Sequence, residues 1–185
     1  MVGIGGTVRP ESSSERALKK ALAAAEAAGA RTRLFDGAFM SGLPIYNPAD
    51  PDHGVGADFL RAVSEADGII VASPGYHGSI SGLVKNTLDT LEGLRDDPRP
   101  YFDGRAVGLI VAADGWQACG SALGALRSVI HAMRGWPTPL GATLNSAGGL
   151  FDADGDFRDR RDAWAVETVA QQVVAFARAF AAPGR

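Results

Sequence analysis

The sequence predicts an α/β protein built on one doubly wound parallel sheet. Short apolar runs alternate with amphipathic helical patterns from one end of the 185-residue chain to the other. Segments that alternate in this way form a parallel sheet with helices on both faces. The composition shows no break, repeat or linker, and the length is ordinary for one domain. We therefore expect residues 1–185 to form a single domain.

The first part of the chain is expected to hold two strands and two helices. We expect strands at residues 2–5 and 31–35, a helix at residues 14–28 and a short helix at residues 57–65. Residues 37–56 form an excursion rich in Gly, Pro and Asp. Ser12 and Glu15 have the spacing of a capping box at the start of the first helix, and Gly29 ends that helix.

The second part is expected to add three strands and three helices. We expect strands at residues 68–73, 106–113 and 140–145, and helices at residues 81–94, 119–134 and 159–181. A polar turn is expected at residues 95–104 and a loop at residues 146–157. The run Gly68-Ile69-Ile70-Val71-Ala72 is apolar throughout, as in a parallel strand buried on both faces. Gly135-Trp136-Pro137 is expected to break the helix before it.

The most informative segment is residues 74–79, which follows the third expected strand. Ligands of open α/β sheets bind outside the carboxyl ends of the strands. Glycines let a flat ligand approach the backbone, and free N–H groups can bond to its edge. The segment therefore predicts a site for a flat aromatic ligand at Pro74, Gly75, Tyr76, His77, Gly78 and Ser79.

Residues 5–14, the first loop, join the first strand to the first helix. Unpaired N–H groups and the helix dipole make such a terminus an anion site. Serines that only cap the helix are the alternative, but this many donors favour a phosphate. The spacing fits neither the dinucleotide-binding nor the P-loop motif. The candidate phosphate ligands are Thr7, Arg9, Ser12, Ser13 and Ser14.

A third candidate loop, residues 113–121, follows the fourth strand and contributes Asp114, Gly115 and Trp116. Gly115 permits close approach of a ligand. Trp116 could stack on a ring or cover the core, and the sequence leaves both interpretations open. Cys119 is expected to be a buried residue at the helix start rather than a reactive thiolate.

Two of these loops resemble motifs of the NADPH-dependent FMN reductases, a flavodoxin-like family. The first loop resembles the family's Gly-Ser-x-Arg-x-x-Ser phosphate loop, with Thr7 and Arg9 in the hydroxyl and arginine places. His77 lies where the family has Asn or His, whereas Gly75 replaces the usual Glu and removes a carboxylate. The match to the Pro-Glu-Tyr-(Asn/His)-Gly-Ser motif and the helix after it rests on Pro74, Tyr76, Gly78, Ser79, Gly82, Lys85, Asn86 and Asp89.

The resemblance implies a flavodoxin-like, five-stranded parallel sheet in the order 2-1-3-4-5, with helices on both faces and FMN held across the three loops. It also implies hydride transfer from NADPH or NADH through FMN to a small-molecule acceptor: free flavin, a quinone, an azo compound, or a metal ion or oxyanion. Homodimers or homotetramers are implied as well. Because the flavin carries the chemistry, no catalytic side chain is expected.

Two alternatives to this function stay open. One is a non-enzymatic flavodoxin-type electron carrier, which the net charge of −3 weakly disfavours because carriers dock through acidic faces. The other is a reductase component that supplies reduced FMN to a partner monooxygenase.

The composition argues against several other classes. The net charge gives no basic patch for nucleic acid, and no apolar run approaches the ~20 residues of a membrane span. A single cysteine excludes an intrachain disulfide and a cysteine-rich metal cluster. Residues 152–156 imitate the start of an EF-hand loop, but Phe157 and Ala163 occupy positions that need Gly and Glu. We expect no metal site, and the lack of a signal pattern makes the cytoplasm the expected compartment.

Overall fold

A parallel sheet lies at the centre of the computed structural model, which describes residues 1–49, 54 and 56–180. Five strands run parallel in the order β2-β1-β3-β5-β6, and the short β4 pairs antiparallel with the end of β3. This order is the expected 2-1-3-4-5 with β4 left out of the count. The strands are β1 (Val2–Gly5), β2 (Arg33–Phe35), β3 (Gly68–Tyr76), β4 (Ser79–Ile80), β5 (Ala106–Ala113) and β6 (Trp136–Asn145).

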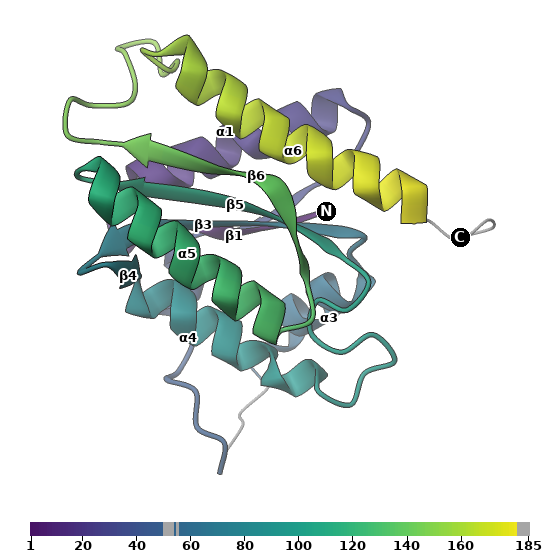
Figure 1. Cartoon of the computed structure of the whole chain (residues 1–185). Helices are drawn as coiled ribbons and strands as arrows, with labels where there is room; N and C mark the ends of the chain where they lie inside the picture. The colour runs from purple at the N-terminus through teal and green to yellow at the C-terminus, as the bar shows by residue number, and fades with distance from the viewer. Residues whose placement is uncertain (50–53, 55, 181–185) are drawn as a thin grey trace.

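Helices cover both faces of the sheet (Figure 1). α1 and α6 pack on one face, and α3, α4 and α5 pack on the other. The helices are α1 (Ser13–Ala27), α2 (Gly37–Ser41), α3 (Ala57–Glu65), α4 (Gly82–Thr90), α5 (Trp116–Ala132) and α6 (Arg160–Phe180), with a 3₁₀ turn η1 (Leu91–Leu94) after α4.

The core has two layers because successive side chains of a strand point to opposite faces. In β3, Ile69 and Val71 face the layer under α3, α4 and α5, whereas Ile70 faces the layer under α1 and α6. Every residue of β5 is buried. This burial explains why the sequence of β5 is apolar without alternation.

Arg105 is a fully buried cation at the amino end of β5. Burial lowers the pKa of its guanidinium to about 10, with a smaller effect from Arg99, so the group stays charged at neutral pH. Within the described part of the chain it donates only to backbone carbonyls. Two of these belong to the C-terminal end of α3, where a cation is favourable. The acceptors are the carbonyl oxygens of Ala66 (2.8 Å), Ser64 (2.6 Å), Tyr101 (3.0 Å), Arg99 (3.3 Å) and Asp103 (3.5 Å).

Several element bounds differ from those expected. β6 begins at Trp136 and not near residue 140, so Gly135-Trp136-Pro137 leads directly into a strand. β6 is an edge strand, where proline removes no hydrogen bond within the sheet. α5 begins at Trp116, three residues earlier than expected. α2 was not expected at all; Asp36 caps it by accepting a hydrogen bond from the N–H of Phe39 (2.9 Å).

Candidate functional site

A cavity of about 210 Å³ opens at the carboxyl ends of the strands, on the side to which the β5 and β6 arrows point in Figure 1. It brings together parts of all three loops singled out in the sequence. Every candidate of the first loop lines it, but His77, Gly78, Ser79, Gly115 and Trp116 lie outside its lining. The lining residues are Thr7, Arg9, Ser12, Ser13, Ser14, Pro74, Gly75, Tyr76, Ala112, Ala113, Asp114 and Ser146.

The hydroxyl groups of the first loop have different tasks. Thr7 Oγ1 accepts from the Arg9 N–H (3.1 Å) and donates to the Arg9 carbonyl (3.0 Å), so it folds the loop back on itself. Ser12 is the N-cap of α1 and accepts from the Glu15 N–H (3.4 Å). The capping interpretation is therefore right for Ser12. No partner for the Ser13 hydroxyl is found among the described residues, and Ser14 Oγ contacts Ser12 Oγ (3.4 Å).

Close backbone contacts hold the first loop in place. A Cβ atom on Gly37, the first residue of α2, would lie 1.8 Å from the Thr7 carbonyl oxygen, so only glycine permits this contact. Glu11 has a φ of 54°, a left-handed conformation that is uncommon for residues other than glycine. Gly37 gave no signal in the sequence because this contact joins segments that are distant in the chain.

The second loop is a tight β-hairpin. Tyr76 pairs with Ser79 across a two-residue turn, and His77 and Gly78 have φ values of 50° and 81°. Two positive φ values are typical of a type I′ turn. Tyr76 is 53% exposed, so its side chain is not a packed core aromatic. At the base of the hairpin, buried Ser73 Oγ accepts from the Ser81 N–H (3.1 Å).

Gly75 departs from the family motif for a packing reason. A Cβ atom at this position would lie 2.8 Å from the Cβ of Ala113 and 3.3 Å from that of Ala122. Glycine thus allows the end of β3 to pack directly against β5 and α5. A glutamate would fit here only if these elements moved apart.

The third loop is short because α5 starts at once after Gly115. The Gly115 N–H donates to Asn145 Oδ1 (3.0 Å). Trp116 is 63% exposed, so the interpretation that it covers the core is wrong. Cys119 is buried as expected, with its thiol directed at the Leu144 carbonyl (3.3 Å), and burial raises the pKa of that thiol.

A fourth segment completes the cavity and was not expected. Ser146 lines it, and Asn145 Oδ1 also accepts from the Ala147 N–H (3.1 Å). Asn145 therefore ties this segment to the third loop. The polar pair Asn145-Ser146 at the end of the last strand could have indicated this wall, because the carboxyl ends of parallel strands share one edge.

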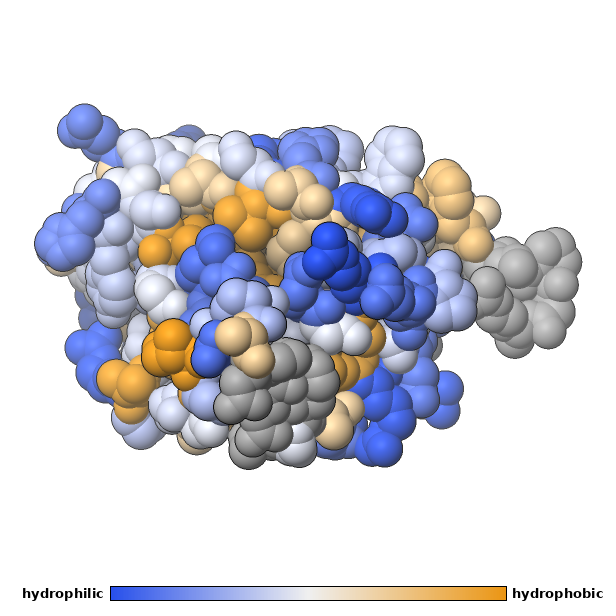
Figure 2. Space-filling model, turned by 90° about the horizontal axis from the view of Figure 1, so that it is seen from below, coloured by the Kyte–Doolittle hydropathy of each residue, from blue (hydrophilic) through white to orange (hydrophobic). Residues whose placement is uncertain are grey.

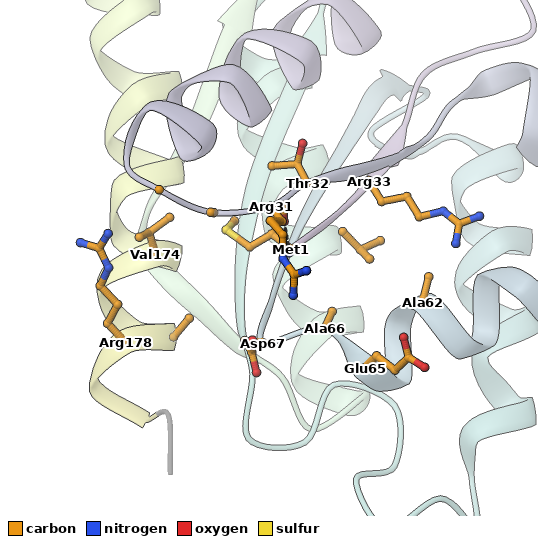
Figure 3. A pocket seen from close by; sticks show the side chains of 14 residues that line it. Met1, Arg31, Thr32, Arg33, Ala62, Glu65, Ala66, Asp67, Val174 and Arg178 are labelled. Atoms are coloured by element: carbon orange, nitrogen blue, oxygen red, sulfur yellow. Dashed lines mark hydrogen bonds between the residues drawn. The ribbon is translucent and has the colours of Figure 1, made fainter. Parts of the chain in front are cut away.

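A larger depression of about 600 Å³ lies at the opposite edge, beside the amino ends of β1, β2 and β3 (Figure 3). Arg31, Asp67 and Arg178 surround it, and the Met1 amino group donates to the Arg31 carbonyl (2.6 Å). Parallel sheets bind ligands at their carboxyl ends. We therefore take the smaller cavity as the candidate site, despite its size.

Metal and membrane features were searched over the described residues. They include no group of three His, Cys, Asp or Glu side chains that could hold a metal ion. Within the same residues, no helix has the length and apolar character needed to span a membrane.

Comparison with known proteins adds to this geometry. The family model described as NADPH-dependent FMN reductase matches residues 1–148. The NAD(P)H-dependent FMN reductase of Pseudomonas aeruginosa is 27% identical over 181 residues, which cover 95% of this chain and 91% of that protein. The FMN-dependent NADPH-azoreductase of Staphylococcus aureus is 30% identical over 100 residues, which cover 54% of this chain and only 50% of that protein.

A solved structure shares the fold. The flavodoxin, WrbA-like protein from Agrobacterium tumefaciens aligns with a TM-score of 0.65 and 17% identity, covering 96% of both chains. At this identity the match supports the fold alone, and the fold is flavodoxin-like.

Proposed function

The chain belongs to the NADPH-dependent FMN reductase family, and from this premise we propose that the cavity at the carboxyl ends of the strands holds FMN. The protein is an FMN-dependent NAD(P)H oxidoreductase that acts on small molecules. When bound, FMN supplies the redox chemistry, namely hydride acceptance from NAD(P)H and reduction of a second acceptor. The protein supplies binding and orientation.

The observation that carries the proposal is the meeting of the first loop with the β3–β4 hairpin around one cavity. The first turn of α1 offers N–H groups and a positive dipole end, which suit a phosphate. Because Ser12 caps the helix, Ser13, Ser14 and Arg9 are the proposed donors to that phosphate, and Thr7 shapes the loop. These residue types fit the charged end of FMN.

The ring of FMN would extend beyond the cavity. Pockets that enclose a whole ligand measure roughly 300–1,000 Å³, and this cavity is smaller at about 210 Å³. Space is open on the side where the ring would lie, since a Cβ atom on Gly78 or Gly115 would meet nothing within 4 Å. We propose that Tyr76, His77 and Ser79 contact one part of the ring and that Asp114, Gly115 and Trp116 contact another.

No side chain of the proposed site is assigned as an obligatory acid or base. Among the described residues, Asp114 is the one carboxylate that lines the cavity. His77 and Tyr76 are exposed on the hairpin. Hydride transfer needs a positioned donor and acceptor more than a protein proton donor. We propose that these side chains tune binding and acceptor choice.

Self-association is part of the proposal. Leu83 of α4 and Leu123, Val129 and Met133 of the α5 region are only partly buried. Figure 2 looks from below onto the side that carries α4, and hydrophobic surface lies there among hydrophilic residues. We propose a homodimer or homotetramer through this side, which light scattering would detect as a mass above 19.2 kDa.

We also propose that residues 1–185 act as one FMN-binding domain, in the cytoplasm.

The experiment that tests the function is an anaerobic titration with NADPH and with NADH after FMN has been added to the protein. We expect either nucleotide to bleach the flavin absorbance at 1:1 stoichiometry with FMN, and an added quinone or azo dye to restore it. A carrier would bind FMN but would not be reduced by NAD(P)H alone. Gel filtration of the loaded protein separates a tightly held cofactor from FMN that is released to a partner monooxygenase.

A further inference from the structure

Two carboxylates lie beside the loop that is proposed to bind a phosphate dianion. The Glu15 side chain is only 7% exposed, and its Oε2 lies 3.1 Å from the place that a Cβ atom on Gly6 would take. Glu15 is therefore packed directly against the backbone of the first loop. Glu11 belongs to that loop and is held in a left-handed conformation. Uncompensated, both charges would repel a phosphate.

Lys19 bridges these two carboxylates. Its Nζ lies 2.9 Å from Glu15 Oε1 and also pairs with Glu11 Oε1. The hydrogen bond from Lys19 lowers the pKa of Glu11, and those to Glu11 and Glu15 raise the pKa of Lys19. One cation on the second turn of α1 therefore holds two anions of the first turn and the loop.

The neighbouring cations are used differently. Arg16 lies over the Phe151 ring, with its Cζ 4.0 Å from the ring centroid. Lys20 pairs with Asp156, on a segment that does not line the cavity (2.6 Å). Within the described part of the chain, Lys19 is the one cation in ion-pair contact with Glu11 or Glu15.

We propose that Lys19 is a positioning and charge-compensating residue of the phosphate site. By pairing with Glu11 and Glu15 it cancels two negative charges beside the first loop and holds Glu11 in its strained conformation. Arg9 and the N–H groups of α1 then present a net positive potential to the phosphate. This inference rests on the proposed function, since it concerns the affinity of the same site for FMN.

The test compares Lys19→Met with Lys20→Met, using FMN and riboflavin as probes in fluorescence titrations. The two variants lose the same charge at adjacent positions of one helix, so a general charge effect would appear in both. We expect Lys19→Met to weaken FMN by about fivefold or more at about 20 mM salt, where screening is weak. Riboflavin, which lacks the phosphate, should change by less than about twofold, and Lys20→Met should leave both ligands within that range.

Two further variants separate charge from structure. Lys19→Arg keeps the cation and should bind FMN within about threefold of the unchanged protein. Glu11→Gln removes one anion while Lys19 remains, and FMN binding should be equal or tighter. The Lys19→Met defect should also shrink at about 500 mM salt, because screening then extends over only a few ångströms.

Four results would overturn the inference. The first two are an FMN affinity of Lys19→Met within about twofold of the unchanged protein at low salt, and equal losses of FMN and riboflavin affinity in that variant. The others are an equal loss of FMN affinity in Lys20→Met and weaker FMN binding by Glu11→Gln. A different result bears on the proposed function itself. If the unchanged protein binds neither FMN nor riboflavin, the proposed function fails. If it binds FMN but Lys19→Met shows no defect, only the role of Lys19 fails.

Discussion

Substitution of Gly75 by alanine tests the packing at the end of β3. The added Cβ would lie 2.8 Å from the Cβ of Ala113, 3.3 Å from that of Ala122 and 3.4 Å from the Ala118 carbonyl oxygen. These atoms are backbone or attached directly to it, so they cannot rotate away as a long side chain would. Overpacking of this kind costs about 1–3 kcal/mol, and the removal of a glycine from a strand returns about 0.5–1 kcal/mol.

The net expectation is a loss of stability of about 1–2 kcal/mol, which for a chain of this size lowers Tm by roughly 2–8 °C. Thermal unfolding of the protein without flavin, followed by circular dichroism, measures this loss. Gly120→Ala is the matched control, because Gly120 is interior to α5 and its Cβ would meet nothing within 4 Å. That substitution should raise the stability by about 0.5–1 kcal/mol.

A second substitution identifies the contact responsible. Ala113→Gly removes the atom nearest to the new Cβ, so Gly75→Ala and Ala113→Gly together should cost less than the sum of their separate costs. A Gly75→Ala protein as stable as the unchanged one would refute the reasoning. Strict additivity of the two substitutions would do so as well.

Three other expectations follow from the described contacts. The double variant Ser13→Ala and Ser14→Ala should weaken FMN binding by about 1–3 kcal/mol and leave riboflavin binding unchanged, because hydrogen bonds to a charged phosphate are lost. Unchanged FMN binding would show that these serines do not belong to the site. Arg105→Met should cost about 3–5 kcal/mol in chemical denaturation, since buried carbonyls lose their donor; a loss below about 1 kcal/mol would contradict the buried role. His77→Ala with FMN bound should slow anaerobic reduction by NADPH less than about tenfold, and a thousandfold loss would assign His77 a proton transfer.

The sequence predicted most of the sheet because its signals are local. β5 is apolar throughout, and the buried positions of β3 are apolar except for Ser73. The 57–65 helix pattern matches α3 residue for residue. The first loop and the 74–79 segment were predicted from residue chemistry alone, and members of both line one cavity. Which of the predicted residues contact FMN stays a prediction.

Other features depend on contacts between distant segments. α2 has five residues, too few to show a helical period. Gly135-Trp136-Pro137 was expected only to break a helix, and the edge position of β6 makes Pro137 acceptable in a strand. The turn at His77 uses a positive φ that glycine, rather than histidine, normally indicates. Ser146 enters the cavity only because β6 lies beside β5.

The central claim is that FMN occupies the cavity at the carboxyl ends of the strands and not the larger depression at the opposite edge. A bulky side chain can fill each in turn: Ser146→Trp for the cavity and Ala177→Trp for the depression, both from half-buried positions. FMN titration of the two folded variants is the decisive measurement. We expect Ser146→Trp to weaken FMN by at least about tenfold and Ala177→Trp to bind FMN as the unchanged protein does. Unchanged FMN binding by Ser146→Trp, with the loss appearing in Ala177→Trp, would contradict it.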